Sequence, residues 1–182
     1  MIKAGIIGAA GYTGGEVARI LLHHPDVELS FVQSDSQNGK KLYEVHNDCF
    51  GVTELQFQKE IGQADVLFLC KGHGESNLFL ETNKISDSVR IIDLSQDFRH
   101  KDNCKLGTKE FVYGLSELNK EKIKSANNIA NPGCFATCIQ LALLPLAEKG
   151  LLHSDINISA KQPGFAMLFA DLIFSLFNSL KP

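Results

Sequence analysis

A glycine-rich turn near the start of the chain constrains the fold more than any other feature. Residues 2–7 form a short apolar run, residues 8–14 read Gly-Ala-Ala-Gly-Tyr-Thr-Gly, and apolar residues then recur at helical spacing until Pro25. Strand, glycine turn and helix in this order are typical of a dinucleotide-binding unit, in which backbone N–H groups reach a pyrophosphate at the helix start. The residues predicted to bind the dinucleotide here are Gly8, Gly11, Tyr12, Thr13 and Gly14. A glycine-rich turn without a ligand is the alternative.

Short apolar runs alternate with helical patterns along the rest of the chain, which is typical of a parallel sheet with crossover helices. Further strands are predicted at 29–32, 66–69, 89–92, near 129 and from 156, and helices around 78–80, after 117 and over 134–149. Pro145 lies inside the last helical pattern and should kink it or end it early. We therefore predict an α/β fold, a Rossmann-like doubly wound parallel sheet, over residues 1–150.

Composition excludes several classes of protein. The 182 residues carry a formal net charge of −3 without a basic run, which argues against nucleic-acid binding. No apolar stretch reaches the roughly 18 residues of a membrane span, and no signal peptide precedes the first strand. Five cysteines at irregular spacing are typical of free thiols in a reducing compartment, so we expect a cytoplasmic protein without a metal site.

The residues after the second predicted strand bear on the choice of cofactor. Asp35 lies where an acidic residue would bind the adenosine ribose of NAD, about 20 residues past the glycines. Hydroxyl and ammonium groups suited to the 2′-phosphate of NADP surround it, on Ser34, Ser36, Lys40 and Lys41. Composition leaves the two cofactors open. Lys40 and Lys41 also fit a solvated loop.

Cys134 follows Asn131-Pro132-Gly133 and begins the longest helical pattern. The unsatisfied N–H groups at a helix start favour a thiolate and can hold an oxyanion. Together with a dinucleotide, this thiol suggests hydride transfer through a thioester. A core cysteine is the alternative for Cys134, and it is our interpretation of Cys138 one turn later.

Residues 93–99, Asp-Leu-Ser-Gln-Asp-Phe-Arg, follow a predicted central strand and could contact the substrate. Arg99 can clamp a phosphate or a carboxylate. A surface ion pair with Asp97 or Asp102 explains this arginine equally well.

Four segments in this order resemble the N-acetyl-γ-glutamyl-phosphate reductase family. They are Gly8–Gly14, Asp93–Arg99, Tyr113–Leu118 and Asn131–Cys134. The resemblance implies that Cys134 is the nucleophile, that NADPH donates the hydride to an N-acylated γ-glutamyl phosphate, and that Arg99 helps to hold this substrate. With it we assign Ser95 and Asn131 to the substrate, Ser34, Ser36, Lys41 and Gly72 to NADP, and His73 to the cofactor pocket. A homo-oligomer is expected for a full-length member.

The chain departs from this family in three places. Family members often carry a basic residue near the position of Asp35. None of its six histidines matches the acid/base histidine of the family's second, α+β catalytic domain, which would begin at residues 151–160. Residues 161–182 form an atypical apolar tail, which we expect to be foreign to the fold and to reflect a reading-frame change or a premature end; a short paralogue with a packed tail is the rival. This chain alone should be almost inactive.

Two other functions stay open on the sequence. A non-catalytic dinucleotide-binding or redox-sensing module would not need the acid/base histidine. An enzyme acting on aspartyl phosphate would keep the chemistry and change the substrate, although residues 93–95 and 113–115 favour the glutamyl enzyme.

Overall fold

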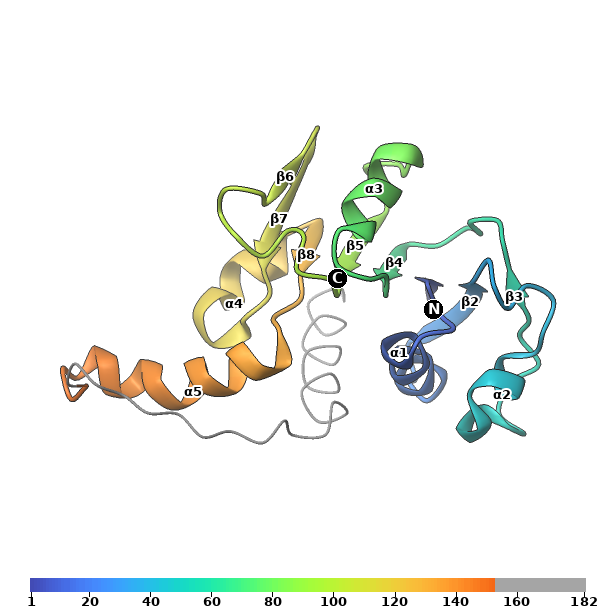
Figure 1. Ribbon diagram of the computed structural model, residues 1–182, viewed down its shortest axis with the longest axis horizontal. Coiled ribbons are helices and arrows are strands. Elements are labelled where there is room, and N and C mark those ends of the chain that lie inside the picture. The colour runs from blue at the N-terminus through green and yellow to red at the C-terminus, as the bar shows by residue number, and fades with distance from the viewer. Residues whose placement is uncertain (153–182) are drawn as a thin grey trace.

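The computed structural model describes residues 1–152, which form one α/β unit (Figure 1). Its strands are β1 (Ile2–Ile7), β2 (Val27–Gln33), β3 (Phe57–Gln58), β4 (Val66–Leu69), β5 (Arg90–Asp93), β6 (Lys105–Leu106), β7 (Lys109–Tyr113) and β8 (Asn128–Ala130). Its helices are α1 (Tyr12–Leu22), α2 (Leu42–Val45), α3 (Glu75–Thr82), α4 (Ser116–Ser125) and α5 (Cys134–Glu148), with a 3-10 turn, η1, at Asn47–Cys49.

The strands form one sheet in the order β3-β2-β1-β4-β5-β8-β7-β6. All neighbouring strands run parallel except the β6–β7 pair. The chain builds outward from β1 through β2 to β3, then returns to the other side of β1 with β4. This reversal confirms the predicted doubly wound, Rossmann-like fold. It places the change of direction between β1 and β4, and sheets of this kind bind ligands at the carboxyl ends of the strands at such a point.

Successive residues of a strand point to opposite faces of the sheet. Buried side chains lie on both faces here, each covered by helices. Val66 and Phe68 of β4 belong to a buried cluster that includes residues of α1 and α4, whereas Leu67 and Leu69 belong to a second cluster with α3. Helices α1 and α3 accordingly lie on opposite sides of the sheet (Figure 1). Burial on both faces explains why β4 reads as a continuous apolar run.

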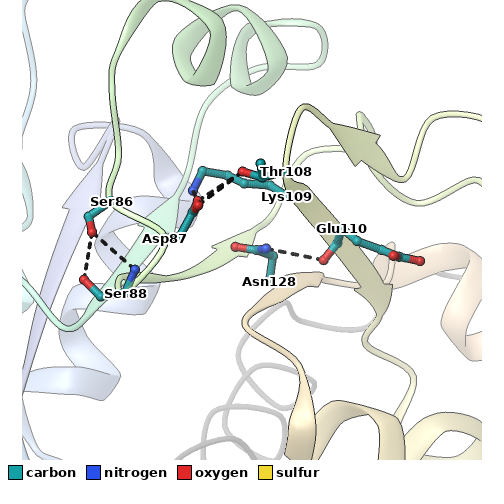
Figure 2. A network of polar contacts seen from close by, with 7 residues as sticks. All are labelled: Ser86, Asp87, Ser88, Thr108, Lys109, Glu110 and Asn128. Carbon is teal, nitrogen blue, oxygen red and sulfur yellow. Dashed lines mark hydrogen bonds and ion pairs between the residues drawn. The ribbon is translucent and has the colours of Figure 1, made fainter.

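Polar contacts tie the α3–β5 loop to the β6–β7 hairpin (Figure 2). The Asp87 carboxylate accepts a hydrogen bond from the Lys109 ammonium at 2.7 Å and contacts the Thr108 hydroxyl at 3.3 Å. The hydrogen bond and the charge of Lys109 lower the pKa of Asp87. Asn128 of β8 donates its side-chain amide to the carbonyl of Glu110 at 3.3 Å, so the strand between β5 and β7 is tied to β7 by a side chain as well.

The structure corrects two expectations for α5. The helix does not end early, since it continues past Pro145 to Glu148; the missing N–H removes a single bond in the last turn. Cys138 is half-buried instead of lying in the core, because only Thr137 of α5 is fully buried among the described residues. Figure 1 shows α5 running away from the sheet, so its middle has few neighbours among residues 1–152.

Within residues 1–152, no helix is both long enough and apolar enough to cross a membrane. The strand predicted from residue 156, the start of a second domain and the apolar tail lie outside the described residues.

Candidate active site

The segments singled out in the sequence meet at one edge of the sheet. Parallel strands place their carboxyl ends together, and here these ends lead into Gly8, Ser34, Cys70, Leu94 and Asn131. Hydrogen bonds tie neighbouring loops to one another: Cys70 N–H donates to Ile7 O and Asn131 N–H to Asp93 O, each at 2.8 Å. The edge is therefore one continuous surface over five adjacent parallel strands.

The glycine turn is built so that its backbone can be closely approached. Gly8 has φ +76°, which other residues rarely adopt, and a Cβ on it would lie 2.8 Å from the carbonyl oxygen of Cys70. A Cβ on Gly14 would lie 2.6 Å from Cα of Ala9, so this glycine lets α1 start directly against the turn. Both positions therefore need glycine for a steric reason, and the glycine pattern fits a dinucleotide cradle.

Gln33, the last residue of β2, holds the first half of this turn. Its backbone carbonyl accepts the N–H of Ala9 at 2.9 Å, and its side-chain oxygen accepts the N–H of Gly8 at 3.3 Å. Gln33 was not among the residues predicted to form the site. No local signal identifies it, because its role depends on β2 lying beside β1.

The helices that start at this edge differ in whether an acidic side chain of the protein accepts hydrogen bonds from the N–H groups of their first turn. At α3, the Asp97 carboxylate accepts the N–H groups of Gly74 at 2.7 Å and Asn77 at 3.0 Å. In contrast, α1 and α5 each have a glycine as N-cap, Gly11 and Gly133, and neither has an acidic residue in its first turn. The positive ends of these two helix dipoles therefore lack a side-chain counterpart from their own caps, and they suit an external anion or an oxyanion.

A groove of about 470 Å³ lies between the end of β2 and α3. Asp35, Lys59 and Lys71 line it, together with apolar side chains of α3 that include Leu78 and Phe79. Two lysines thus share the groove with two acidic residues, Asp35 and Glu75. Lys59 and Lys71 cannot be recognised as cofactor residues from the sequence, because only the fold brings them to one groove with Asp35.

The residues after β2 that were predicted to bind the 2′-phosphate do not all lie together. The hydroxyls of Ser34 and Ser36 lie 3.3 Å apart at the end of β2. The ammonium of Lys41 instead contacts the Glu54 carboxylate and the Glu54 carbonyl, both at 3.1 Å. Lys40 is exposed. The structure therefore brings Ser34 and Ser36 together and engages Lys41 elsewhere.

Arg99 is fixed beside the start of α5. Its Nε donates to the carbonyl of Asn131 at 2.8 Å, and Nη2 donates to the carbonyl of Leu94 at 2.9 Å. A Cβ on Gly133 would lie 2.7 Å from Nη1, so glycine is required before Cys134 to admit this guanidinium. Burial lowers the pKa of Arg99, while the negative charge of Asp93 opposes that shift.

The alternative of a surface ion pair for Arg99 is wrong. The Asp97 carboxylate caps α3, and no ion pair joins Arg99 to Asp97 or Asp102 within residues 1–152. Two main-chain carbonyls in fork geometry replace the expected carboxylate partner.

Ser95 lies inside the turn that carries Asp97 and Arg99. It is 1% exposed; its hydroxyl donates to the Asp93 carboxylate at 2.7 Å and accepts the N–H of Asp97 at 3.0 Å. Burial raises the pKa of Asp93, and the hydrogen bonds from Ser95 act against that rise. The pair Asp93–Ser95 therefore shapes the loop from within.

Two residues expected at the cofactor lie in the exposed loop between β4 and α3. Gly72 N–H approaches the Glu75 carboxylate at 3.3 Å, and the His73 Nδ1 accepts the N–H of Gln96 at 3.2 Å. The contact from His73 joins this loop to the one that carries Arg99. The described residues contain no cluster of histidine, cysteine and acidic side chains suited to a metal ion.

Asn131 and Cys134 stand at the two ends of the turn into α5. Asn131 is buried and directs its side-chain amide to the carbonyl of Pro132 at 3.0 Å. Cys134 is half-buried as the first residue of α5. Thr137 closes the first helical turn with its hydroxyl on the carbonyl of Gly133 at 2.7 Å. The thiol position thus lies on a turn that Arg99 and Thr137 both hold.

A model of the family described as semialdehyde dehydrogenase, NAD binding domain, matches residues 3–126. The chain belongs to this family. Among curated relatives it is 58% identical over 161 residues to the N-acetyl-gamma-glutamyl-phosphate reductase of Christiangramia forsetii and 52% identical over 162 residues to that of Azobacteroides pseudotrichonymphae. Each match covers 88% of this chain and 49% and 50% of the respective relative, so the chain spans about half of their length.

Solved structures of semialdehyde dehydrogenases share the fold. The aspartate semialdehyde dehydrogenase of Candida albicans with NADP aligns at 18% identity with a TM-score of 0.59, covering 84% of this chain and 48% of that one. The aspartate semialdehyde dehydrogenase II of Vibrio cholerae complexed with ASA aligns at 21% identity with a TM-score of 0.61, covering 81% and 47%. These likenesses support the Rossmann-like architecture.

Proposed function

We propose that this chain is the dinucleotide-binding half of an NADPH-dependent N-acyl-γ-glutamyl-phosphate reductase. Residues 1–150 bind the cofactor and supply Cys134 as the nucleophile, and residues 151–160 begin the second domain. The names of the curated relatives support the substrate class, a small acyl phosphate. A histidine acid/base is expected from the half of the relatives that this chain does not span.

The observation that supports this proposal most directly is the difference between the N-terminus of α3 and the N-termini of α1 and α5. Asp97 fills the start of α3, whereas α1 and α5 begin with glycine caps and without acidic residues. One of these glycine-capped starts follows the glycine turn and the other carries Cys134, so an anionic cofactor and a reacting acyl group have separate places on one edge.

The residues around Cys134 fit thioester chemistry. The thiolate of Cys134 attacks the acyl carbon, the C–O bond to phosphate breaks, and inorganic phosphate leaves with its electron pair. Backbone N–H groups at the start of α5 stabilise the oxyanion formed in that attack. Arg99, with Nη1 next to Gly133, holds a carboxylate or phosphate of the substrate, and Asn131 and Ser95 shape the turn around it. When bound, NADPH supplies the hydride that converts the thioester to aldehyde and frees the thiol.

We assign the cofactor to the glycine turn and the adjoining groove. Gly8, Gly11, Tyr12, Thr13 and Gly14 form the turn under the pyrophosphate, and Gly72 adjoins it. Ser34 and Ser36 with Lys59 and Lys71 surround the 2′-phosphate of NADP. We give Lys41 a lesser part than the sequence suggests, because its ammonium is engaged by Glu54.

NADPH is expected to bind at least about tenfold more tightly than NADH, because Lys59 and Lys71 line the groove and can bind the 2′-phosphate, which NADH lacks. Lys71→Met should weaken NADPH and leave NADH unchanged, and Asp35→Ala should strengthen NADPH. Fluorescence titration with both reduced cofactors measures each affinity. Equal affinities, or an NADH preference that Asp35→Ala removes, would mean that the aspartate decides the cofactor.

Turnover tests the proposed reaction itself. In the reverse direction, phosphate-dependent reduction of NADP is measured with N-acetyl- and N-succinyl-glutamate semialdehyde, on this chain and on a chain extended by the other half of its relatives. We expect activity in the extended chain and almost none in the 182 residues alone. NADPH binding without any such activity in the extended chain would favour a non-catalytic dinucleotide module.

A further inference from the structure

We propose that His46 is a positioning residue for the dinucleotide: its ring fixes the glycine turn through Ala9, and Gly15 is a glycine because that ring occupies the space of its side chain. The inference rests on the proposed dinucleotide binding and adds a residue from outside the turn to that site. His46 lies 37 residues from Ala9 in the sequence, and no motif points to it.

A single hydrogen bond links the His46 ring to the turn. Nε2 lies 2.8 Å from the carbonyl oxygen of Ala9. A carbonyl oxygen can only accept, so Nε2 carries the hydrogen and donates it. The N–H of Ala9 is bound in turn by the carbonyl of Gln33 at 2.9 Å. Both polar groups of Ala9 are thereby held from outside the turn.

Satisfied carbonyls matter in a turn that binds an anion through its N–H groups. The carbonyl of Gly8 accepts the N–H of Gly11 at 3.3 Å, and the carbonyl of Ala9 accepts the His46 ring. Without His46, the Ala9 carbonyl loses its donor, and rotation of the adjacent peptide groups would spoil their orientation toward a phosphate. His46 therefore contributes to preorganisation of the turn without touching the ligand.

The segment that carries His46 is itself anchored. The N–H of His46 donates to Leu42 O at 2.9 Å, and the N–H of Cys49 donates to His46 O at 3.0 Å. Leu42 and Cys49 are both buried, at 0% and 1% exposure. The ring also packs against Phe57, with centroids 6.4 Å apart. A ring held in this way transmits its position to the turn.

Gly15 lies against the other side of the His46 ring. A Cβ built on Gly15 would overlap Nδ1 and Cε1 of the His46 ring. The φ of Gly15 is not positive, so its backbone conformation does not call for glycine. Alanine is otherwise the better residue in the first turns of a helix. The ring therefore explains this glycine.

Two substitutions of similar size separate the hydrogen bond from the loss of the ring. The side-chain amide of glutamine reaches the position of Nε2, whereas that of asparagine reaches only the position of Nδ1. We expect His46→Asn to weaken NADPH binding about tenfold, the equivalent of one lost hydrogen bond, and His46→Gln to stay within about threefold of the parent. Fluorescence titration of NADPH measures both, with His23→Asn, an exposed histidine at the end of α1, as the unchanged control.

A second ligand distinguishes positioning of the turn from general damage to the fold. Adenosine 2′-monophosphate has the base and the 2′-phosphate but no pyrophosphate, so its affinity should be equal in the parent and in both His46 variants. Gly15→Ala should weaken NADPH as His46→Asn does, by displacing the ring. In a His46→Ala background the same Gly15→Ala change should have no further effect, because the space is then empty.

The ring nitrogens provide a readout that needs no ligand. In the ¹⁵N spectrum of the parent chain, Nε2 of His46 should carry a proton, because it donates to the carbonyl of Ala9. A proton on Nδ1 and none on Nε2, equal NADPH affinities for His46→Asn and the parent, or parallel losses of NADPH and adenosine 2′-monophosphate would each overturn the inference alone. Absence of NADPH binding by the parent chain would overturn the proposed function, and the inference with it.

Discussion

Replacing Cys134 with serine in the chain extended by the other half of its relatives is expected to lower phosphate-dependent NADP reduction by at least about 10³-fold. Serine keeps the size of the side chain at the start of α5 but offers a hydroxyl that is hardly ionised near neutral pH. The NADPH dissociation constant should change by less than about twofold, since the glycine turn and the groove lie on other strand ends.

Cys138→Ser is the matched control for this experiment. Cys138 lies one turn further along α5, is half-buried like Cys134, and has no place in the proposed chemistry. It should retain activity close to the parent. Equal losses in the two serine variants would mean that packing of α5, and not a nucleophile at position 134, limits the reaction.

Replacing Phe98 with alanine is expected to reduce the free energy of unfolding by about 3–5 kcal/mol, the range for deletion of a buried phenylalanine. Phe98 is 1% exposed and stacks on Phe111 with ring centroids 4.0 Å apart and an interplanar angle of 7°. It belongs to the buried cluster that includes α3 residues and lies between Asp97 and Arg99 in the chain. Urea denaturation of the parent and the variant measures the difference.

Phe135→Ala is the control variant, because it removes an exposed phenylalanine instead of a buried one. This residue is 48% exposed as the second residue of α5, so its truncation should cost less than about 1 kcal/mol. A loss of similar size in both variants would contradict the expectation that burial of Phe98 stabilises the fold more than the half-exposed Phe135 does.

Local signals predicted the central part of the fold. β1 and β4 have the predicted bounds, because a strand buried on both faces reads as an uninterrupted apolar run. β7, the strand at Lys109–Tyr113, was not predicted: it begins with two charged residues and only Phe111 is buried. β3 and β6 are two residues long, too short for any periodicity to show.

Some parts of the candidate site can likewise be recognised from the sequence, and others cannot. The glycine turn and the start of α5 are visible in the sequence, because a turn and a helix start are made by consecutive residues. Other contacts join strand ends that are distant in the sequence. Asp97 caps α3, Arg99 donates to the carbonyl of Asn131, and Lys59 lines the same groove as Asp35. Such contacts depend on the order of the strands, which one sequence does not reveal residue by residue.

Competitive alkylation of the five thiols at pH 7, with peptide mapping, tests most directly whether this edge of the sheet carries an activated nucleophile. Burial raises the pKa of both Cys49 and Cys70, and the Cys104 thiol donates to the carbonyl of Lys101 at 3.3 Å. Cys134 should label fastest, because its helix begins with a glycine cap and no acidic residue. Faster labelling of Cys49 or Cys104 in the folded chain would contradict the assignment of Cys134.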